Sequence, residues 1–197
     1  MKAVRVITGR AVPLRRNDVD TDQIIPAEWL KRVERTGFEK GLFSTWRDDR
    51  DFVLNDERYT GATILLAGTN FGTGSSREQA ATCLQHFGIP CVIAHSFSET
   101  YKRNAFNNGF VVFECPELVA WLADKYGGPG GPAQASPQTA VGAATVIGPD
   151  VVIDYRASTI TCDGRTFAFP PLSVVAQELV VAGGAENVVK KRLAAMA

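Results

Sequence analysis

Apolar residues gather in the middle of the chain into short runs that alternate with amphipathic segments. Three largely apolar runs of strand length, 63–67, 90–94 and 110–113, are separated by two segments whose apolar residues suggest helices, 75–87 and 98–107. The second helical segment ends at an Asn-Gly pair, a common stop signal for a helix. The order strand, helix, strand, helix, strand predicts parallel strands joined by helical crossovers, and therefore an α/β fold.

The two flanks of this central unit follow different patterns. The chain opens with a short alternating strand that contains Val4 and Val6. Residues 31–58 are charged and interrupted by glycine, which predicts a loop with short helical turns outside the core. Residues 127–138 are rich in glycine and proline and predict an exposed, mobile loop. The last part predicts strands near 144–147, 151–155, 158–162 and 166–169, and helices near 172–181 and 185–195.

Composition narrows the classes of partner. The 197 residues suffice for one domain with a sizeable core, and 45% of them are hydrophobic. Lys and Arg number 21, as do Asp and Glu, so the zero net charge gives no general attraction to nucleic acid or an anionic membrane. The sequence has no apolar run of about 18 residues and no apolar signal-peptide core at its start. We expect a single cytoplasmic domain over 1–197, with neither nucleic acid nor a membrane as partner.

Four cysteines, at positions 83, 91, 115 and 162, are spread along the chain without a Cys-x-x-Cys spacing. Zinc and iron–sulfur sites usually show such clustering, so we expect this chain alone to bind no metal. The apolar surroundings of Cys83 and Cys91 predict buried thiols, which fits a reducing cytoplasm.

The segment most suited to chemistry lies between the first central strand and the helix that follows it. Gly72 and Gly74 allow positive φ angles and the close approach of a ligand. We expect the helix to start near Ser75, where unpaired N–H groups and the helix dipole suit a carboxylate or a phosphate. Arg77 adds a bidentate donor for a carboxylate, and Ser76 is a hydroxyl whose alkoxide this field would stabilise, allowing it to accept a proton from carbon.

A purely structural explanation of the same residues stands beside the functional one. Ser75 and Glu78 have the spacing of a capping box, a contribution of about 1 kcal/mol to helix stability. The two explanations are compatible, because Ser75 can cap the helix while Ser76 and Arg77 face a ligand. The segment lacks the lysine of a Walker A loop and the glycine spacing of dinucleotide-binding loops.

The alternating carboxylates Asp18, Asp20 and Asp22 have the spacing that opens an EF-hand calcium loop. The sixth position of that loop would be Gln23 instead of glycine, and the twelfth would be Trp29 instead of glutamate. A calcium site is therefore excluded, and a polar loop remains as the interpretation.

Three segments carry a resemblance to a known family. They are Asp20-Thr21-Asp22-Gln23-Ile24-Ile25-Pro26, Asn70-Phe71-Gly72-x-Gly74-Ser75-Ser76-Arg77-Glu78 and Ser96-Phe97-x-x-x-Tyr101-x-x-Asn104-x-x-Asn107-Asn108-Gly109. In this order and spacing, and with Arg35-Thr36-Gly37-Phe38 between the first two, they resemble the small subunits of 3-isopropylmalate dehydratases. The same domain forms the C-terminal part of single-chain aconitases.

The resemblance implies an aconitase-type swivelling domain with β/β/α layers, in which a partly parallel, barrel-like sheet is flanked by helices. It also implies a larger partner chain that carries a [4Fe–4S] cluster on three cysteines, while this chain binds no cofactor. The implied reaction converts 2-isopropylmalate, a small dicarboxylate, into 3-isopropylmalate by dehydration and rehydration in leucine biosynthesis. This chain would be active only within the heteromeric enzyme.

The resemblance further implies roles for individual residues. Ser76 would remove or return the carbon-bound proton, Arg77 would bind a substrate carboxylate, and Ser75 would contact the substrate beside them. A mobile substrate loop near 28–45 would contribute Lys31 or Arg32 as a further carboxylate contact. Two alternatives stay open: the small subunit of homoaconitase or another dicarboxylate hydro-lyase, and a non-catalytic anion-binding assembly module.

Overall fold

Seven strands form one mixed sheet in the computed structural model, which describes residues 6–31, 37–126 and 150–196. The strands are β1 (Val6–Pro13), β2 (Ile64–Ala67), β3 (Cys91–Ala94), β4 (Val111–Glu114), β5 (Asp150–Asp154), β6 (Thr159–Cys162) and β7 (Arg165–Ala168). Their order in the sheet is β4-β3-β2-β1-β5-β6-β7.

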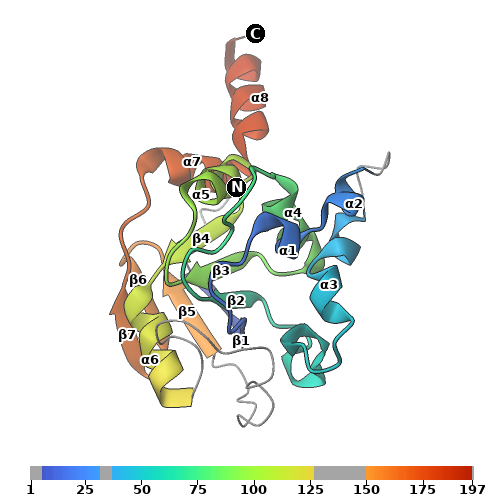
Figure 1. Ribbon diagram of the computed structural model, residues 1–197. Coiled ribbons are helices and arrows are strands. Elements are labelled where there is room, and N and C mark those ends of the chain that lie inside the picture. The colour runs from blue at the N-terminus through green and yellow to red at the C-terminus, as the bar shows by residue number, and fades with distance from the viewer. Residues whose placement is uncertain (1–5, 32–36, 127–149, 197) are drawn as a thin grey trace.

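Strand β1 joins two differently paired halves of this sheet. On one side β1 pairs in parallel with β2, and β3 and β4 continue the parallel arrangement. On the other side β1 pairs antiparallel with β5, followed by β6 and β7. The sheet is curled (Figure 1), so that side chains of the parallel half and of β5–β7 meet in one core cluster. The predicted α/β fold with a partly parallel, barrel-like sheet is confirmed.

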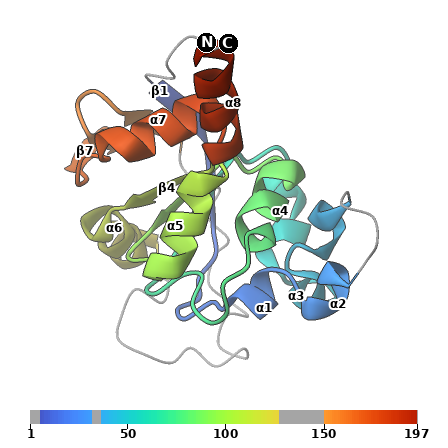
Figure 2. The same ribbon diagram turned by 90° about the horizontal axis from the view of Figure 1, so that it is seen from above.

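Alternation along the central strands divides the core between the two faces of the sheet. In β3, Cys91 and Ile93 pack into the cluster shared with the antiparallel half, whereas Val92 and Ala94 point to the opposite face. That opposite face is covered by helices α4 (Gln79–Phe87) and α5 (Glu99–Asn107), which contact each other (Figure 2). The segment that carries the site motifs therefore lies on the α4–α5 side of the sheet.

The remaining helices frame this core. They are α1 (Thr21–Ile24), α2 (Ala27–Leu30), α3 (Ser44–Arg47), α6 (Pro116–Tyr126), α7 (Val174–Ala182) and α8 (Ala185–Met196), with 3₁₀ turns η1 (Phe38–Gly41), η2 (Val53–Asn55) and η3 (Glu57–Tyr59). Within the described ranges, none of the helices has the length and apolar character needed to cross a bilayer.

The predicted loop over residues 31–58 is wrong in one respect. Short helical turns form as expected, but the segment also enters the core, where Leu42, Phe43 and Phe52 are buried. Phe43 stacks on Trp46 at a centroid distance of 5.4 Å, and Arg16 lies 4.1 Å above the Trp46 ring. Sparse aromatic side chains thus bury a segment whose average polarity indicates a surface loop.

Helix α6 was not among the predicted elements, although it supplies Leu118 and Leu122 to the core cluster of the antiparallel half. The strands predicted after residue 150 and the two terminal helices are confirmed within about two residues. The predicted strand near 144–147 and the glycine- and proline-rich loop near 127–138 lie outside the described residues. The prediction of a mobile substrate loop near 28–45 falls partly outside them and stays a prediction.

Candidate functional site

The loop that follows β2 lies along the segment that follows β1. The carbonyl of Val19 accepts hydrogen bonds from the N–H groups of Gly72 (2.8 Å) and Thr73 (3.2 Å). The N–H of Thr21 donates in return to the carbonyl of Thr73, at 2.9 Å. Because β1 and β2 are parallel neighbours, both loops leave the same edge of the sheet. The first two sequence motifs are therefore in direct contact.

The predicted capping box of Ser75 and Glu78 does not form. Helix α4 begins at Gln79, and Glu78 occupies its N-cap position without a side-chain hydrogen bond. Ser75 lies ahead of the helix, where its carbonyl accepts from the Thr21 hydroxyl at 2.8 Å instead of opening the helical ladder. Ser75 and Ser76 therefore lie outside the helix, and Ser75 does not cap it.

A capping box does form on the other side of the contact, at α1. The side chain of Asp20 accepts from the N–H of Gln23 at 2.8 Å, and the Gln23 side chain accepts from the N–H of Asp20 at 3.0 Å. Ile24 and Ile25 are fully buried in the core beneath this turn. The Asp20–Ile25 turn is thus fixed at its start by the cap and at its end by apolar packing.

Ser76 is an exposed residue whose hydroxyl accepts a hydrogen bond from a side chain of α5. The side-chain amide of Asn104 donates to the Ser76 oxygen at 3.0 Å. Asn104 is one of two buried polar residues in the described core, and its carbonyl accepts from the Asn108 side chain at 2.9 Å. A neutral donor aimed at a serine oxygen stabilises the alkoxide relative to the hydroxyl, which favours proton transfer.

Arg77 reaches back to the first motif. Its Nη1 donates to the carbonyl of Ile25 at 3.1 Å and pairs with the Asp22 carboxylate at 2.5 Å. The Arg77 side chain is 15% exposed, whereas Asp22 is 54% exposed at the outer side of the pair. Both contacts engage Nη1, which is one corner of the guanidinium. The whole group carries five N–H donors in a rigid plane.

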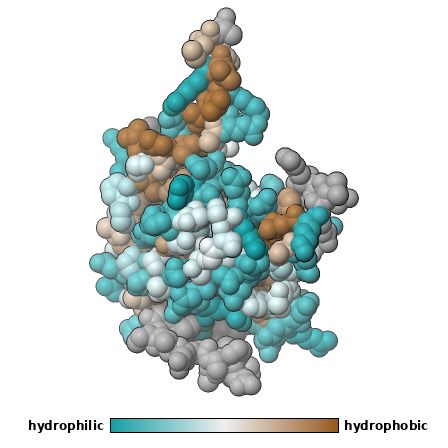
Figure 3. Space-filling view, turned by 45° about the horizontal axis from the view of Figure 1, so that its top comes forward, coloured by the Kyte–Doolittle hydropathy of each residue, from teal (hydrophilic) through white to brown (hydrophobic). Residues whose placement is uncertain are grey.

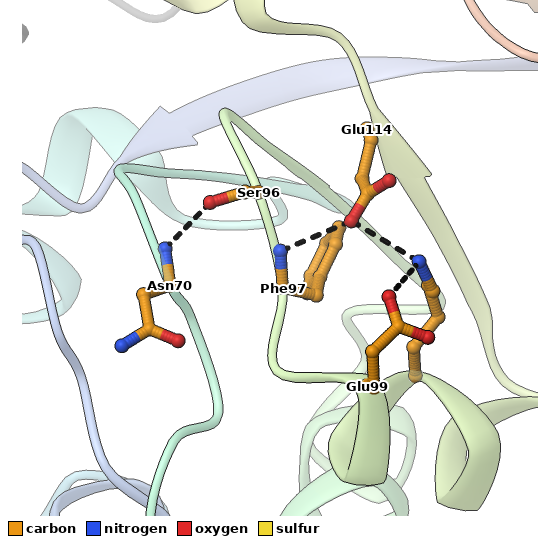
Figure 4. Close-up of polar contacts among 6 residues, drawn as sticks. Asn70, Ser96, Phe97, Glu99 and Glu114 are labelled. Carbon is orange, nitrogen blue, oxygen red and sulfur yellow. Dashed lines mark hydrogen bonds and ion pairs between the residues drawn. The ribbon is translucent and has the colours of Figure 1, made fainter.

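The third motif fixes the loop from the side of β3 and β4. The Ser96 hydroxyl accepts from the backbone N–H of Asn70 at 2.9 Å, and Glu114 accepts from the N–H of Phe97 at 3.2 Å (Figure 4). Lys102 joins Glu114 at 3.3 Å and Glu99 at 2.7 Å. Burial acts to lower the pKa of Lys102, but its hydrogen bonds and charge contacts with the two carboxylates raise it overall. Lys102 is therefore a cation at neutral pH.

An aromatic cluster lies beneath the glycine-rich loop. Phe71, Phe97 and Tyr101 pack with centroid distances of 5.4 to 6.1 Å. Gly72 has a φ of 76°, and a Cβ on it would overlap the Tyr101 ring. Glycine is required here for both its φ and its small volume. The Tyr101 hydroxyl is buried without a partner in the described part of the chain, and burial raises the pKa of Tyr101 well above its usual value.

Of the two basic residues proposed for the substrate loop, the structure describes one. Lys31 directly follows α2 and is exposed. Arg32 lies outside the described residues. Of the predicted site residues, Ser75, Ser76 and Arg77 thus lie on one segment ahead of α4, and a contribution from the substrate loop stays a prediction.

Three residues of the site were missed as functional candidates in the sequence. Thr21 and Asp22 were interpreted as part of a polar loop, and Asn104 had no assigned role. Their only signal was membership of the motifs that carry the family resemblance. Their contacts with Ser75, Arg77 and Ser76 span 28 to 55 residues along the chain, so no local pattern indicates them.

The cysteines of this chain do not fit an iron–sulfur cluster. All four are buried and lie on separate elements: Cys83 on α4, Cys91 on β3, Cys115 before α6 and Cys162 on β6. Burial raises the pKa of Cys83 to about 12 and that of Cys162 to about 11. Such thiols stay protonated near neutral pH, whereas cluster ligands are thiolates. Across the described ranges, no three His, Cys, Asp or Glu side chains are grouped to hold a metal ion.

Comparisons with known proteins identify the family of this chain. The family model of the aconitase C-terminal domain matches residues 1–118. The 3-isopropylmalate dehydratase small subunit of Streptomyces avermitilis is 56% identical over 173 residues, covering 86% of this chain and 78% of that protein. The corresponding small subunit of Parafrankia is 59% identical over 116 residues, covering 59% of this chain and 60% of that protein. The chain thus spans about 60% of the length of the first curated relatives that it matches.

A solved structure gives the same result over nearly the whole chain. The crystal structure of a 3-isopropylmalate dehydratase protein from Methanocaldococcus jannaschii has a TM-score of 0.72 and 28% sequence identity, and the match covers 97% of each chain. The chain therefore belongs to the aconitase C-terminal domain family, among the small subunits of 3-isopropylmalate dehydratases.

Proposed function

We propose that this chain is the small subunit of a hydro-lyase that interconverts 2-isopropylmalate and 3-isopropylmalate. The observation that carries the proposal is the position of Ser75, Ser76 and Arg77 on one loop that the other two motifs hold in place. A hydroxyl next to a guanidinium is the pairing needed to move a proton on a substrate that carries carboxylates. The relatives named above support the specific substrate.

The chemistry divides into two balanced steps. In dehydration, a base takes the proton of one carbon while hydroxide leaves the neighbouring carbon, and the electron pair of the C–H bond becomes the second bond between them. In rehydration, a hydroxide adds to the carbon that lost the proton, and the protonated base gives its proton to the carbon that lost the hydroxyl. By family resemblance, a [4Fe–4S] cluster on the partner chain would supply the Lewis acid for the departing hydroxyl. The residues of this chain handle the proton and hold a carboxylate.

Ser76 is our first candidate for the proton-transfer group, because Asn104 fixes its oxygen and stabilises its alkoxide. Ser75 becomes the second candidate, because it does not cap α4 and is an exposed residue next to Ser76 in the chain. Arg77 would hold one substrate carboxylate with the donors that Asp22 and Ile25 leave free. Lys31 and Arg32 remain proposed contacts for a second carboxylate.

The proposed partner is a larger subunit that carries the cluster. An exposed apolar stripe on α7 and α8 supports a partner, and Figure 3 shows it as a brown surface along both helices. On α8, Val189, Leu193 and Met196 follow helical spacing, with Leu193 62% and Met196 85% exposed. Helix α8 has 12 residues, of which Val188 is the buried one. Packing within this chain therefore contributes little to its stability.

The enzyme would act in the cytoplasm. The four buried, unpaired cysteines support a reducing compartment, in which thiols persist.

Reconstitution tests the proposed function. The isolated chain should show no turnover, because its described residues form no metal site that could bind the departing hydroxyl. Mixed anaerobically with the cluster-loaded large subunit of the same organism, it should convert 2-isopropylmalate, measured by the ultraviolet absorbance of the unsaturated intermediate. Homocitrate serves as the substrate control for a homoaconitase. Turnover of homocitrate but not of 2-isopropylmalate would contradict the assigned substrate.

The apolar stripe gives a separate prediction about assembly. Replacing Leu193 by glutamate places a charge in the proposed interface and should weaken association with the large subunit at least tenfold, because burying an unpaired charge is costly. Ala194→Glu is the matched control, since it adds the same charge on another side of the same exposed helix. Affinities from calorimetry that are equal for the two variants would place the interface elsewhere. If a second copy of this chain occupied the stripe instead, the isolated chain would be a dimer in solution, and Leu193→Glu would lower its measured molecular mass to that of a monomer.

A further inference from the structure

The Asp20–Asp22 segment remains without a function after the calcium interpretation is excluded. Its three residues make three different contacts: Asp20 caps α1, Thr21 binds the backbone of Ser75, and Asp22 pairs with Arg77. Two of the three contacts end on residues of the candidate site. We propose that Thr21 and Asp22 are positioning residues, which set the backbone at Ser75 and the plane of the Arg77 guanidinium for binding the substrate carboxylate. This inference rests on the proposed function, because it assumes that Arg77 is the carboxylate ligand.

Thr21 is suited to hold a backbone segment in one conformation. It is 2% exposed, its hydroxyl donates to the Ser75 carbonyl at 2.8 Å, and its N–H donates to the Thr73 carbonyl at 2.9 Å. The chain between these two carbonyls contains Gly74, whose φ of 87° belongs to the left-handed region. A glycine at this point leaves the backbone many alternatives, and two bonds from one buried residue select among them.

Asp22 and the Ile25 carbonyl together fix the orientation of a planar group. Both contact Nη1 of Arg77, at 2.5 Å and 3.1 Å, so the guanidinium is held at one corner from two directions. A bidentate grip on a carboxylate requires two parallel N–H donors in a defined plane. An arginine that is already oriented loses less conformational freedom when the substrate binds.

The exposure of Asp22 separates this role from simple stabilisation of the fold. An ion pair whose carboxylate is 54% exposed contributes little to stability, because solvent screens it. Asp22 is also an anion that competes with the substrate carboxylate for Arg77. Its presence favours substrate binding only if the gain from orienting Arg77 is larger than the loss from this competition. The turn itself is anchored independently, by the Asp20–Gln23 capping box and by Ile24 and Ile25 in the core.

The first experiment measures the steady-state kinetics of the assembled enzyme with Asp22→Asn and Asp22→Glu. Asp22→Asn should raise KM roughly 10-fold with kcat changed less than about 3-fold, because it loosens a group that binds substrate, and small misplacements have effects of this size. Asp22→Glu keeps the charge and should recover part of the loss. In an Arg77→Lys background, Asp22→Asn should cause no further increase in KM. An unchanged KM for Asp22→Asn, or an equal increase in both backgrounds, would overturn the proposal for Asp22.

Thr21 is tested with a nearly isosteric pair of variants. Thr21→Val removes the donor to Ser75 and should lower kcat roughly 10-fold, while Thr21→Ser keeps the donor and should stay within about 3-fold of the unaltered enzyme. Asp20→Ala is the structural control, because it removes the α1 cap and should lower the thermal midpoint without raising KM. Equal kcat values for Thr21→Val and Thr21→Ser would remove Thr21 from the positioning role.

A third readout needs no turnover and uses the isolated chain. The Arg77 Nε–H signal in an NMR spectrum should be sharp in the unaltered chain and broadened in Asp22→Asn, because the guanidinium becomes mobile. The backbone spectrum, which reports on the fold, should stay the same. An immobile guanidinium in Asp22→Asn would contradict the proposal whatever the substrate. Failure of the proposed function would appear differently, as an unaltered assembled enzyme that does not convert 2-isopropylmalate.

Discussion

Replacing Ser76 by alanine is expected to lower kcat of the assembled enzyme by a factor of about 10² to 10⁴, the usual contribution of a positioned acid–base group. The hydroxyl accepts from Asn104 at 3.0 Å and lies on an exposed loop, so its loss should leave the fold and the assembly intact. KM should change little, because Arg77 and the other carboxylate contacts remain. Steady-state kinetics on the reconstituted enzyme, together with thermal unfolding of the isolated chain, measure both quantities.

Ser75→Ala is the matched comparison for this prediction. With no capping box at α4, it should leave stability within about 0.5 kcal/mol of the unaltered chain, as exposed substitutions usually do. If Ser75→Ala produced the large loss in kcat and Ser76→Ala did not, proton transfer would belong to Ser75. If neither variant lowered kcat by tenfold, the loop would bind an anion without taking part in proton transfer.

Replacing Gly72 by alanine is expected to be the most destabilising of the substitutions considered, at roughly 2–4 kcal/mol. The backbone φ of 76° is unfavourable for an L-residue, and the new Cβ would overlap the ring of Tyr101, which is itself 1% exposed. Either the Tyr101 ring or the loop must then move. Because the loop leads directly to Ser75, activity should fall together with stability.

Gly88→Ala separates the two causes. Gly88 ends α4 with a φ of 102°, and no atom lies within 4 Å of the position that a Cβ would take. Its substitution should cost about 1–2 kcal/mol from backbone strain alone. Denaturant unfolding of both variants measures the difference. Equal losses at the two glycines would mean that the aromatic cluster under the loop adapts without cost.

Local patterns were sufficient to predict much of the fold. The apolar runs at β2, β3 and β4 and the helical spacing between them predicted three parallel strands, and the structure pairs them in that way. These elements are buried on both faces, so each of their residues carries the same apolar signal. The segment 31–58 was predicted to lie outside the core, and this was wrong because its core contacts depend on isolated residues, such as Phe43 and Phe52, within a charged stretch.

The start of α4 shows where local rules were overridden. Ser75 and Glu78 satisfy the capping-box spacing, and nothing nearby in the sequence contradicts it. The Thr21 hydroxyl, 54 residues away, takes the Ser75 carbonyl instead. A single buried donor from another element can decide between two local conformations of similar energy, and the sequence pattern contains no record of that donor.

The sequence by itself determined the α/β class, the family and the identity of the loop that bears Ser75, Ser76 and Arg77, because these follow from periodicity and from motifs that are contiguous in the chain. Only the tertiary structure decided that Asn104 binds Ser76, that Thr21 and Asp22 hold the same loop, and that Ser75 stands outside the helix. These contacts join the segments that follow β1 and β2 with one another and with helix α5, which follows β3. Their partners become neighbours only when β1, β2 and β3 align in the sheet, so distance along the chain conceals them.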